Sequence, residues 1–114
     1  MNKDFRHTVM ETSCGVVLVN FGSILLLQYP QGHWDFPKGH VEEDDDDRKA
    51  TAARELAEET GISDIQFIDD FEFRTAYDFR HKGKRIDKQV FWYICLLYTS
   101  DAADEGLGVD LGGR

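Results

Sequence analysis

The sequence has 114 residues, a formal net charge of −9, 41% hydrophobic residues and 31% charged residues. This length suits a single domain, and the acidic excess argues against non-specific binding to nucleic acid. With two cysteines, no apolar run long enough to cross a membrane and no apolar signal segment at the start, we expect a cytoplasmic protein without a disulfide framework.

The first predicted elements are a β-hairpin and a helix. Two short apolar runs, 14–19 and 24–28, flank Asn20-Phe-Gly-Ser23, which is typical of a turn. A loop from Tyr29 to Gly39 follows. The helix is predicted over Asp44 to Thr60, because its aspartates suit the positive end of the helix dipole. Gly61 is the predicted C-cap, and the predicted apolar face consists of small residues, namely Ala50, Ala53, Leu56 and Ala57.

The second half of the chain is predicted to form strands. A strand starts at residues 65–68, and residues 81–84 make a turn. Residues 90–94 are apolar on both faces, which indicates a central strand. Strands before and after one helix predict a mixed α/β class. Residues 71–79 alternate in polarity, so four aromatic side chains share one face: Phe71, Phe73, Tyr77 and Phe79.

The end of the helix carries the strongest functional signal. Glu55, Glu58 and Glu59 are spaced by three and four residues, so they project from one helix face about one turn apart. Carboxylates crowded in this way repel one another unless a cation lies between them. Hard oxygen ligands favour magnesium, manganese or calcium over zinc. A solvated acidic helix face is the alternative interpretation.

The residues around this triad resemble a family pattern. Gly39, an acidic loop and Arg54-Glu-Leu-Ala-Glu-Glu-Thr-Gly-Ile62 together resemble the Nudix box, in which glycine precedes an isolated glutamate and then Arg-Glu-apolar-x-Glu-Glu-x-Gly-apolar. The interval from Gly39 to Arg54 is one residue longer than in that pattern, and an aspartate replaces the isolated glutamate. If the position of this isolated glutamate is counted forward from Gly39, it falls on Asp45. If it is counted back from Arg54, it falls on Asp46. An added loop residue costs little entropy.

The resemblance implies an α/β/α sandwich with a mixed sheet. It also implies an enzyme that hydrolyses a nucleoside diphosphate linked to another group, by attack of water on phosphorus. Mg²⁺ or Mn²⁺ would be held by Glu55, Glu58 and Glu59 and by the backbone carbonyl of Gly39 or Lys38. Glu58 and Glu55 are the candidates for general base. Arg54 would orient a carboxylate, although an ordinary helix salt bridge is the alternative.

The flanking segments resemble the asymmetrical diadenosine tetraphosphate hydrolases within that family. The similarity covers residues 10–94, including Gln28-Tyr-Pro30, the loop from His33 to Glu42 and the strand from Lys88 to Tyr93. It implies a small-molecule nucleotide substrate, diadenosine tetraphosphate, which is cut to ATP and AMP.

Four side chains are candidates for binding that substrate. His33 and Lys38 would contact phosphates, with Lys88 as a weaker candidate, and Tyr77 would stack on adenine. His33 is otherwise expected as a surface residue, and Tyr77 as a core-facing aromatic. The alternatives are a Nudix pyrophosphohydrolase acting on RNA 5′ ends or oxidised nucleotides, and a Nudix-fold binding module without catalysis.

Residues 95–114 resemble a translated sequencing adapter. A transposon-end oligonucleotide translates in one frame to the segment from Cys95 to Glu105, and an outer adapter translates to the segment from Val109 to Arg114. We therefore expect a Nudix domain over 1–94 that is incomplete at its C-terminus, and a non-native tail over 95–114. The last helix of the sandwich would be missing, which would leave apolar surface exposed. Leu96, Leu97 and Tyr98 are expected to extend the last strand by chance.

Overall fold

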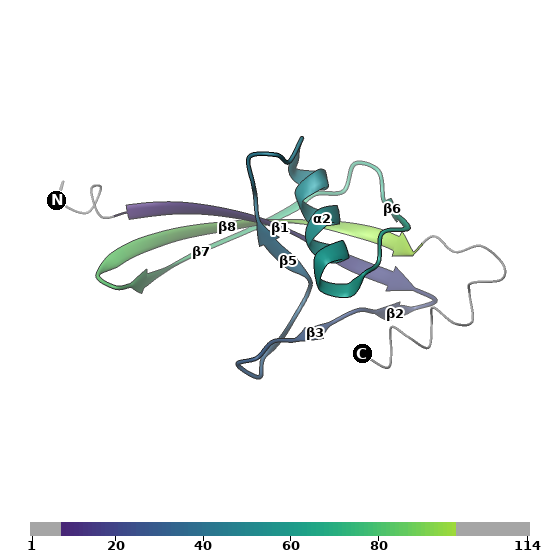
Figure 1. Ribbon diagram of the computed structural model, residues 1–114, viewed down its shortest axis with the longest axis horizontal. Helices are drawn as coiled ribbons and strands as arrows, with labels where there is room; N and C mark the ends of the chain where they lie inside the picture. Colours follow the sequence, from purple (N-terminus) through teal and green to yellow (C-terminus); the bar gives the residue numbers. More distant parts are fainter. Residues whose placement is uncertain (1–7, 98–114) are drawn as a thin grey trace.

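The computed structural model describes residues 8–97. Figure 1 shows a long, curved sheet with one helix packed across its middle. The strands form a six-stranded mixed sheet and a small two-stranded sheet, β3–β4. The elements are β1 (Thr8–Asn20), β2 (Ser23–Ile24), β3 (Leu27–Gln28), β4 (Trp34–Asp35), β5 (Lys38–His40), α2 (Arg48–Thr60), β6 (Ile65–Phe67), β7 (Phe73–His81) and β8 (Lys84–Leu97).

Two long strands form the centre of the main sheet. β1 and β8 run parallel, from the pair Thr8–Arg85 to the pair Val19–Leu96. β5 and β2 pair antiparallel with β1, whereas β7 and β6 pair antiparallel with β8. The prediction that residues 90–94 form a central strand is therefore confirmed, and the sheet is mixed, as expected.

β8 continues beyond Ile94 to Leu97. The side chain of Cys95 is fully buried and belongs to the hydrophobic core. The prediction that Leu96 and Leu97 extend the strand is confirmed, and Tyr98 lies outside the described residues. A domain boundary at residue 94 stays a prediction.

The predicted hairpin forms, but its second strand is shorter than expected. β1 turns at Phe21 and Gly22, both with positive φ, and pairs with β2 over two residue pairs. The predicted run 24–28 was wrong as one strand, because it divides into β2 and β3. β3 leaves the main sheet and pairs with β4 instead.

The helix differs from its prediction in its start and in its buried face. It begins at Arg48 rather than Asp44, because Asp47 is the N-cap and its carboxylate accepts the Ala50 N–H at 2.8 Å. Gly61 is the C-cap, with φ of 81°, as predicted. The buried residues are Thr51, Ala52 and Leu56. The expected face of Ala50, Ala53 and Ala57 was wrong, since these three are only half-buried.

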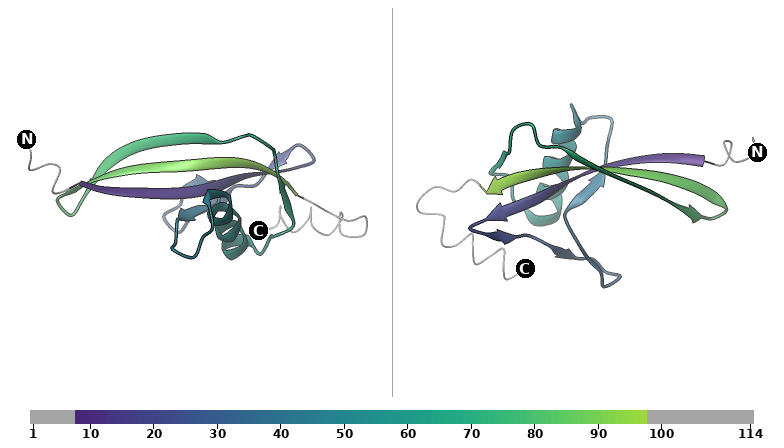
Figure 2. Two further views of the ribbon diagram at one scale, coloured as in Figure 1. Left: turned by 90° about the horizontal axis from the view of Figure 1, so that it is seen from above. Right: turned by 180° about the vertical axis from the view of Figure 1, so that it is seen from behind.

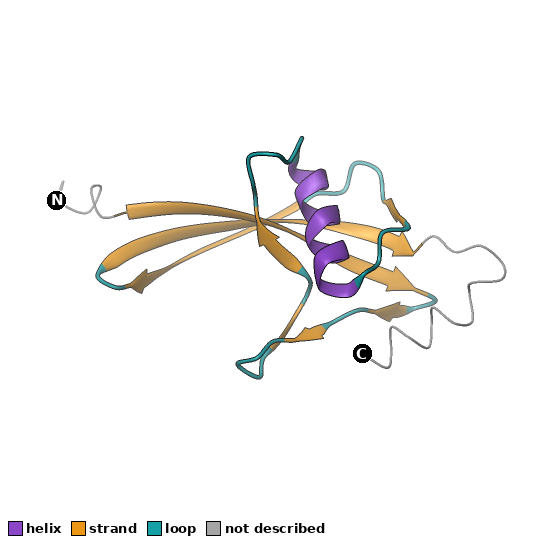
Figure 3. Cartoon of the chain, in the orientation of Figure 1, coloured by secondary structure: helices purple, strands orange, loops and turns teal. Residues whose placement is uncertain are grey.

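The core lies between α2 and one face of the sheet (Figure 3). The left view in Figure 2 shows the helix on one side of the sheet only. Among the described residues there is one helix layer, and no helix there is long and apolar enough to cross a membrane. The opposite face of β7 presents three aromatic side chains that are 57%, 51% and 41% exposed, namely Phe73, Tyr77 and Phe79.

Candidate active site

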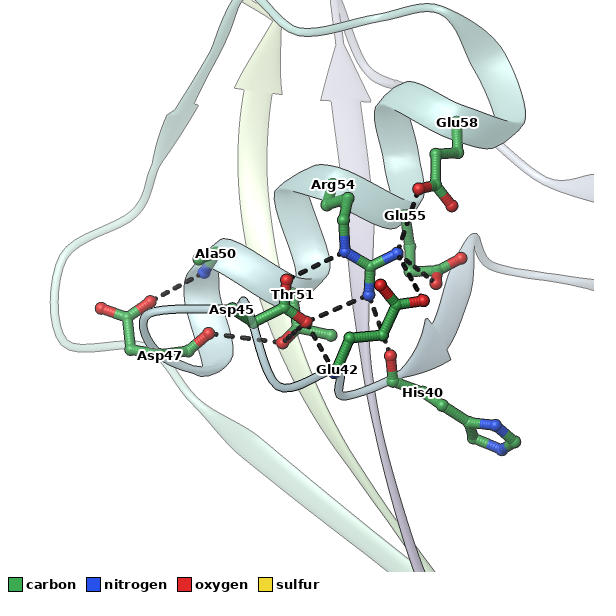
Figure 4. Close-up of polar contacts among 9 residues, drawn as sticks. All are labelled: His40, Glu42, Asp45, Asp47, Ala50, Thr51, Arg54, Glu55 and Glu58. Atoms are coloured by element: carbon green, nitrogen blue, oxygen red, sulfur yellow. Dashed lines mark hydrogen bonds and ion pairs between the residues drawn. The ribbon is translucent and has the colours of Figure 1, made fainter.

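Arg54 is the centre of a polar network that joins α2 to the preceding loop (Figure 4). Its guanidinium donates to Glu55 at 2.9 Å and to Glu58 at 3.1 Å. It also donates to the backbone carbonyl of His40 at 2.9 Å and to both carboxylate oxygens of Asp45. One cation therefore orients two of the three helix glutamates and holds the loop against the helix.

Asp45 is the aspartate that occupies the acidic position of the loop. It receives Arg54 side-on, at 2.9 and 3.1 Å, and it also accepts the Glu42 N–H and the Thr51 hydroxyl. The Asp45 side chain is only 6% exposed. The hydrogen bonds from Arg54, followed by those from Glu42 and Thr51, hold the pKa of Asp45 well below its usual range. Asp45, which the forward count from Gly39 selects, is thus the aspartate of this run that contacts Arg54.

Gly39 lies directly against the carboxylate of Glu55. A Cβ atom added at Gly39 would lie 2.0 Å from Cδ of Glu55 and 2.2 Å from Oε1. Such a distance is far below a van der Waals contact. Gly39 pairs with Cys14 in the β5–β1 ladder, so the sheet edge fixes its backbone. Any side chain at this position would therefore displace the Glu55 carboxylate from its present place.

Glu59 projects toward a second group of residues in the loop before β5. Burial raises the pKa of Glu59, and the nearby charge of Glu55 raises it further, whereas Lys38 and Tyr29 act in the opposite direction. Burial, followed by the charge of Glu59, raises the pKa of Tyr29 to about 12. Glu55 and Glu59 are therefore close enough to repel each other, and Tyr29 and Lys38 lie beside them.

The Tyr29 ring contacts both candidates for phosphate binding, His33 and Lys38. The His33 ring stacks on the Tyr29 ring, with centroids 5.2 Å apart, and Lys38 Nζ lies 5.6 Å from the same centroid. Lys38 also forms a 3.0 Å ion pair with Asp35. Tyr29 was not among the predicted site residues, although it lies in the segment 28–30 that carried the family resemblance.

Tyr77 and Lys88 lie on the other face of the sheet from α2. They are register partners on β7 and β8, and the position beside Lys88 on β1 is Glu11. Lys88 Nζ lies 3.2 Å from Nε2 of His40, and Gly39, the neighbour of His40, faces the helix. Successive strand residues point to opposite faces. The structure therefore separates Tyr77 and Lys88 from the glutamates, which lie on the opposite face of the sheet.

The donor set suits a hard divalent cation in its chemistry. Glu55 and Glu59 repel each other beside the backbone of Gly39, and carboxylate oxygen is the ligand type that magnesium prefers. Within residues 8–97, no three His, Cys, Asp or Glu side chains are gathered as metal ligands. Glu58 is turned toward Arg54 and is 58% exposed.

Comparison with solved structures gives the class of protein. The fold is similar to a Caenorhabditis elegans Ap4A hydrolase, with a TM-score of 0.65 and 32% identity over 82% of this chain and 72% of that one. A NUDIX hydrolase from Nitrosomonas europaea, at 22% identity and a TM-score of 0.50, shares the fold. These likenesses define a Nudix fold with a mixed sheet.

Sequence comparison gives the family. The NUDIX domain model matches residues 10–108, so the chain belongs to the Nudix family. An RNA pyrophosphohydrolase of Caulobacter vibrioides is 39% identical over 104 residues, which is 79% of this chain and 59% of that protein. A mouse asymmetrical bis(5′-nucleosyl)-tetraphosphatase is 42% identical over 72 residues, which is 60% of this chain and 46% of that protein. The chain thus spans about half the length of these curated relatives.

Proposed function

We propose that this chain is the catalytic part of a Nudix hydrolase that cleaves diadenosine tetraphosphate to ATP and AMP. The observation that carries the proposal is the arrangement of residues 29–39. This segment places a stacked Tyr29–His33 pair and the cation of Lys38 beside Glu59 and Glu55. An aromatic surface for a base, a cation for phosphate and acidic metal ligands are thus adjacent. The likeness to the C. elegans Ap4A hydrolase supports the same substrate class.

The proposed mechanism assigns a role to each side chain of the network. Glu55, Glu58 and Glu59, with the carbonyl of Gly39, would hold Mg²⁺ or Mn²⁺. Such a cation would neutralise phosphate oxygens and would lower the pKa of the attacking water. Glu58 is the candidate to accept the proton of that water. Of the two α2 glutamates that bind Arg54, it is the more exposed. Arg54 holds Glu55 in place while Glu58 moves.

The remaining candidates bind the substrate. Lys38 and His33 would contact phosphate oxygens, because cationic donors pair strongly with them. Tyr77 is half exposed on the far face, where Lys88 is close to His40. These two would contact the part of a long substrate that extends past the edge strand β5. A dinucleotide has a base at each end, so it offers one part to each group. We place this activity in the cytoplasm.

The experiment uses diadenosine tetraphosphate, magnesium and ¹⁸O-labelled water with the purified protein. The expected products are ATP and AMP in equal amounts, with the label in one of them, as attack of water on phosphorus requires. Two ADP molecules would contradict asymmetrical cleavage. Omission of the divalent cation should abolish turnover.

A second candidate is RNA 5′-end pyrophosphohydrolysis, favoured by the 39% identity to the C. vibrioides protein. RNA with a 5′-triphosphate and an oxidised nucleoside triphosphate serve as competing substrates. A higher kcat/KM on either of them overturns the dinucleotide proposal. Binding of all three without turnover of any would identify a non-catalytic Nudix-fold module instead.

A further inference from the structure

The outer edge of β7 is free of any strand in the described part of the chain. β7 pairs with β8 along one side, and the sheet order places nothing on its other side. Figure 2 shows β7 along the border of the sheet. The strand is nine residues long and contains no proline, glycine or lysine. Proline and lysine are two of the residues by which proteins protect an edge strand from pairing with another chain, whereas the charges of β7, on Arg74, Asp78 and Arg80, are of both signs.

The sequence of β7 is complementary to itself when the strand is reversed. The segment from Glu72 to Arg80 reads Glu-Phe-Arg-Thr-Ala-Tyr-Asp-Phe-Arg. If a second copy runs antiparallel with Ala76 opposite its own equivalent, unlike charges and aromatic side chains meet across the pair. The resulting pairs are Glu72 with Arg80, Phe73 with Phe79, Arg74 with Asp78, and Thr75 with Tyr77.

The neighbouring registers lack this complementarity. Side chains on opposite positions of an antiparallel pair must share a face, so a symmetric pair can shift its centre only by whole residues. With Tyr77 at the centre, Arg74 would face Arg80. With Thr75 at the centre, Glu72 would face Asp78. Like charges directly opposite each other destabilise a strand pair, so the charges select the register centred on Ala76.

The side chains in question are available at the surface. Arg74, Asp78 and Arg80 are exposed. Phe73 and Phe79 are 57% and 41% exposed and share one face of the strand. Burial of both rings against a second copy would remove apolar surface from water on two molecules at once. Two existing bonds, from Arg74 to Gln89 and from Arg85 to Asp78, run toward β8. Glu72 precedes β7 and already accepts hydrogen bonds from Arg48 and Tyr93, so Arg74 with Asp78 is the charge pair that chiefly carries the proposal.

We propose that two copies of this chain associate through β7. The two strands pair antiparallel about a two-fold axis at Ala76, and the two main sheets become one continuous sheet. The contact is isologous, so it closes as a dimer and does not propagate into a filament. It leaves α2 and the segment 29–40 uncovered. The glutamates of α2 stay open in this arrangement, whereas Tyr77, the candidate for stacking on the substrate, lies on β7 opposite Thr75 of the second copy.

Sedimentation velocity over a concentration series tests this association by charge reversal. The native chain is expected to form a dimer that dissociates on dilution. Arg74→Asp and Asp78→Arg each place like charges opposite one another at two symmetric positions, and each should weaken the dimer about tenfold or more. The double variant that exchanges the two residues should restore it. Asp64→Arg, a charge reversal at an exposed residue away from β7, is the control and should leave the dimer unchanged.

A cross-linking experiment fixes the register independently. Ala76→Cys brings two thiols together at the two-fold axis, where opposite Cβ atoms are about 5 Å apart, and mild oxidation should join the copies. Lys82→Cys is the control, since its two copies would be roughly 40 Å apart at about 3.3 Å per residue. Cys14 and Cys95 are buried in the native chain, so neither is expected to form the cross-link. A native chain that stays monomeric up to its solubility limit overturns the proposal, as does a dimer that is indifferent to charge reversal or that cross-links equally at both positions.

Discussion

Replacement of Gly39 by alanine is the sharpest test of the proposed metal site. The added Cβ would lie 2.0 Å from Cδ of Glu55, whereas non-bonded carbon atoms approach to about 3.5 Å. Either the Glu55 carboxylate or the β5 backbone must therefore move by roughly 1.5 Å. A misplacement of about 1 Å at a catalytic group can cost about 10²-fold in rate. We expect Gly39→Ala to lower kcat/KM by about that factor and to weaken Mn²⁺ binding.

The assays are steady-state turnover of diadenosine tetraphosphate and Mn²⁺ titration followed by electron paramagnetic resonance. Gly22→Ala is the matched control, because Gly22 has a φ of +79° but nothing within 4 Å of an added Cβ. It should lower stability by about 1–2 kcal/mol and leave Mn²⁺ affinity unchanged. If Gly39→Ala keeps native Mn²⁺ affinity and turnover, Glu55 does not act from the position described.

Three further predictions concern the same network. Glu58→Gln should lower kcat by about 10²–10⁴-fold; native turnover at saturating magnesium would remove Glu58 from the proposed role. Tyr29→Ala removes the stack on His33 and should raise KM by about 2–10-fold, whereas Tyr29→Phe keeps the ring and should raise it little; equal effects would show that the hydroxyl matters more than the stack. The pKa of Asp45 is depressed in the folded state, so its stabilising contribution is present above its ordinary value of 3.8 and is lost as pH falls through the folded pKa. Asp45→Asn should therefore have a lower free energy of unfolding than the native chain in urea at pH 7, and the difference between the two should shrink below pH 4. A difference that does not change with pH would contradict this.

The sequence predicted which helices and strands form better than it predicted the residues at which they begin and end. The apolar run 90–94 indicated a central strand, because a strand that is apolar on both faces is typical of the middle of a sheet. The aspartates 44–47 were compatible with a first helical turn and equally with a loop and a cap. In the structure these aspartates form a loop and a cap. Asp45 lies in the loop before the helix, where it bonds to the Glu42 N–H and to Arg54.

The buried face of α2 could not be read from polarity alone. Thr51 is polar and Ala50 is apolar, yet Thr51 is fully buried. The reason is that the Thr51 hydroxyl donates to Asp45 at 2.8 Å, which removes the cost of burying it. That partner comes from the loop, and a helical periodicity contains no information about the loop.

The candidate site was predicted in part. The spacing of the Glu55, Glu58 and Glu59 side chains gave the acidic face of the helix, and the Arg54 network is the geometry that its place in the motif implied. The motif gave no indication that Tyr77 and Lys88 would lie across the sheet. That separation depends on the pairing of β1 with β8 and β5, which is a long-range property of the chain.

The parallel pairing of β1 with β8 also has a consequence for synthesis of the protein. Each pair joins residues 77 positions apart, from Thr8–Arg85 to Val19–Leu96. During translation the apolar first strand is complete long before its partner leaves the ribosome. Non-local pairing of this kind folds slowly and leaves strands open to aggregation while they wait. Yield in cells should therefore depend on chaperones that hold the β1 segment, and should rise at low temperature, where synthesis and aggregation both slow.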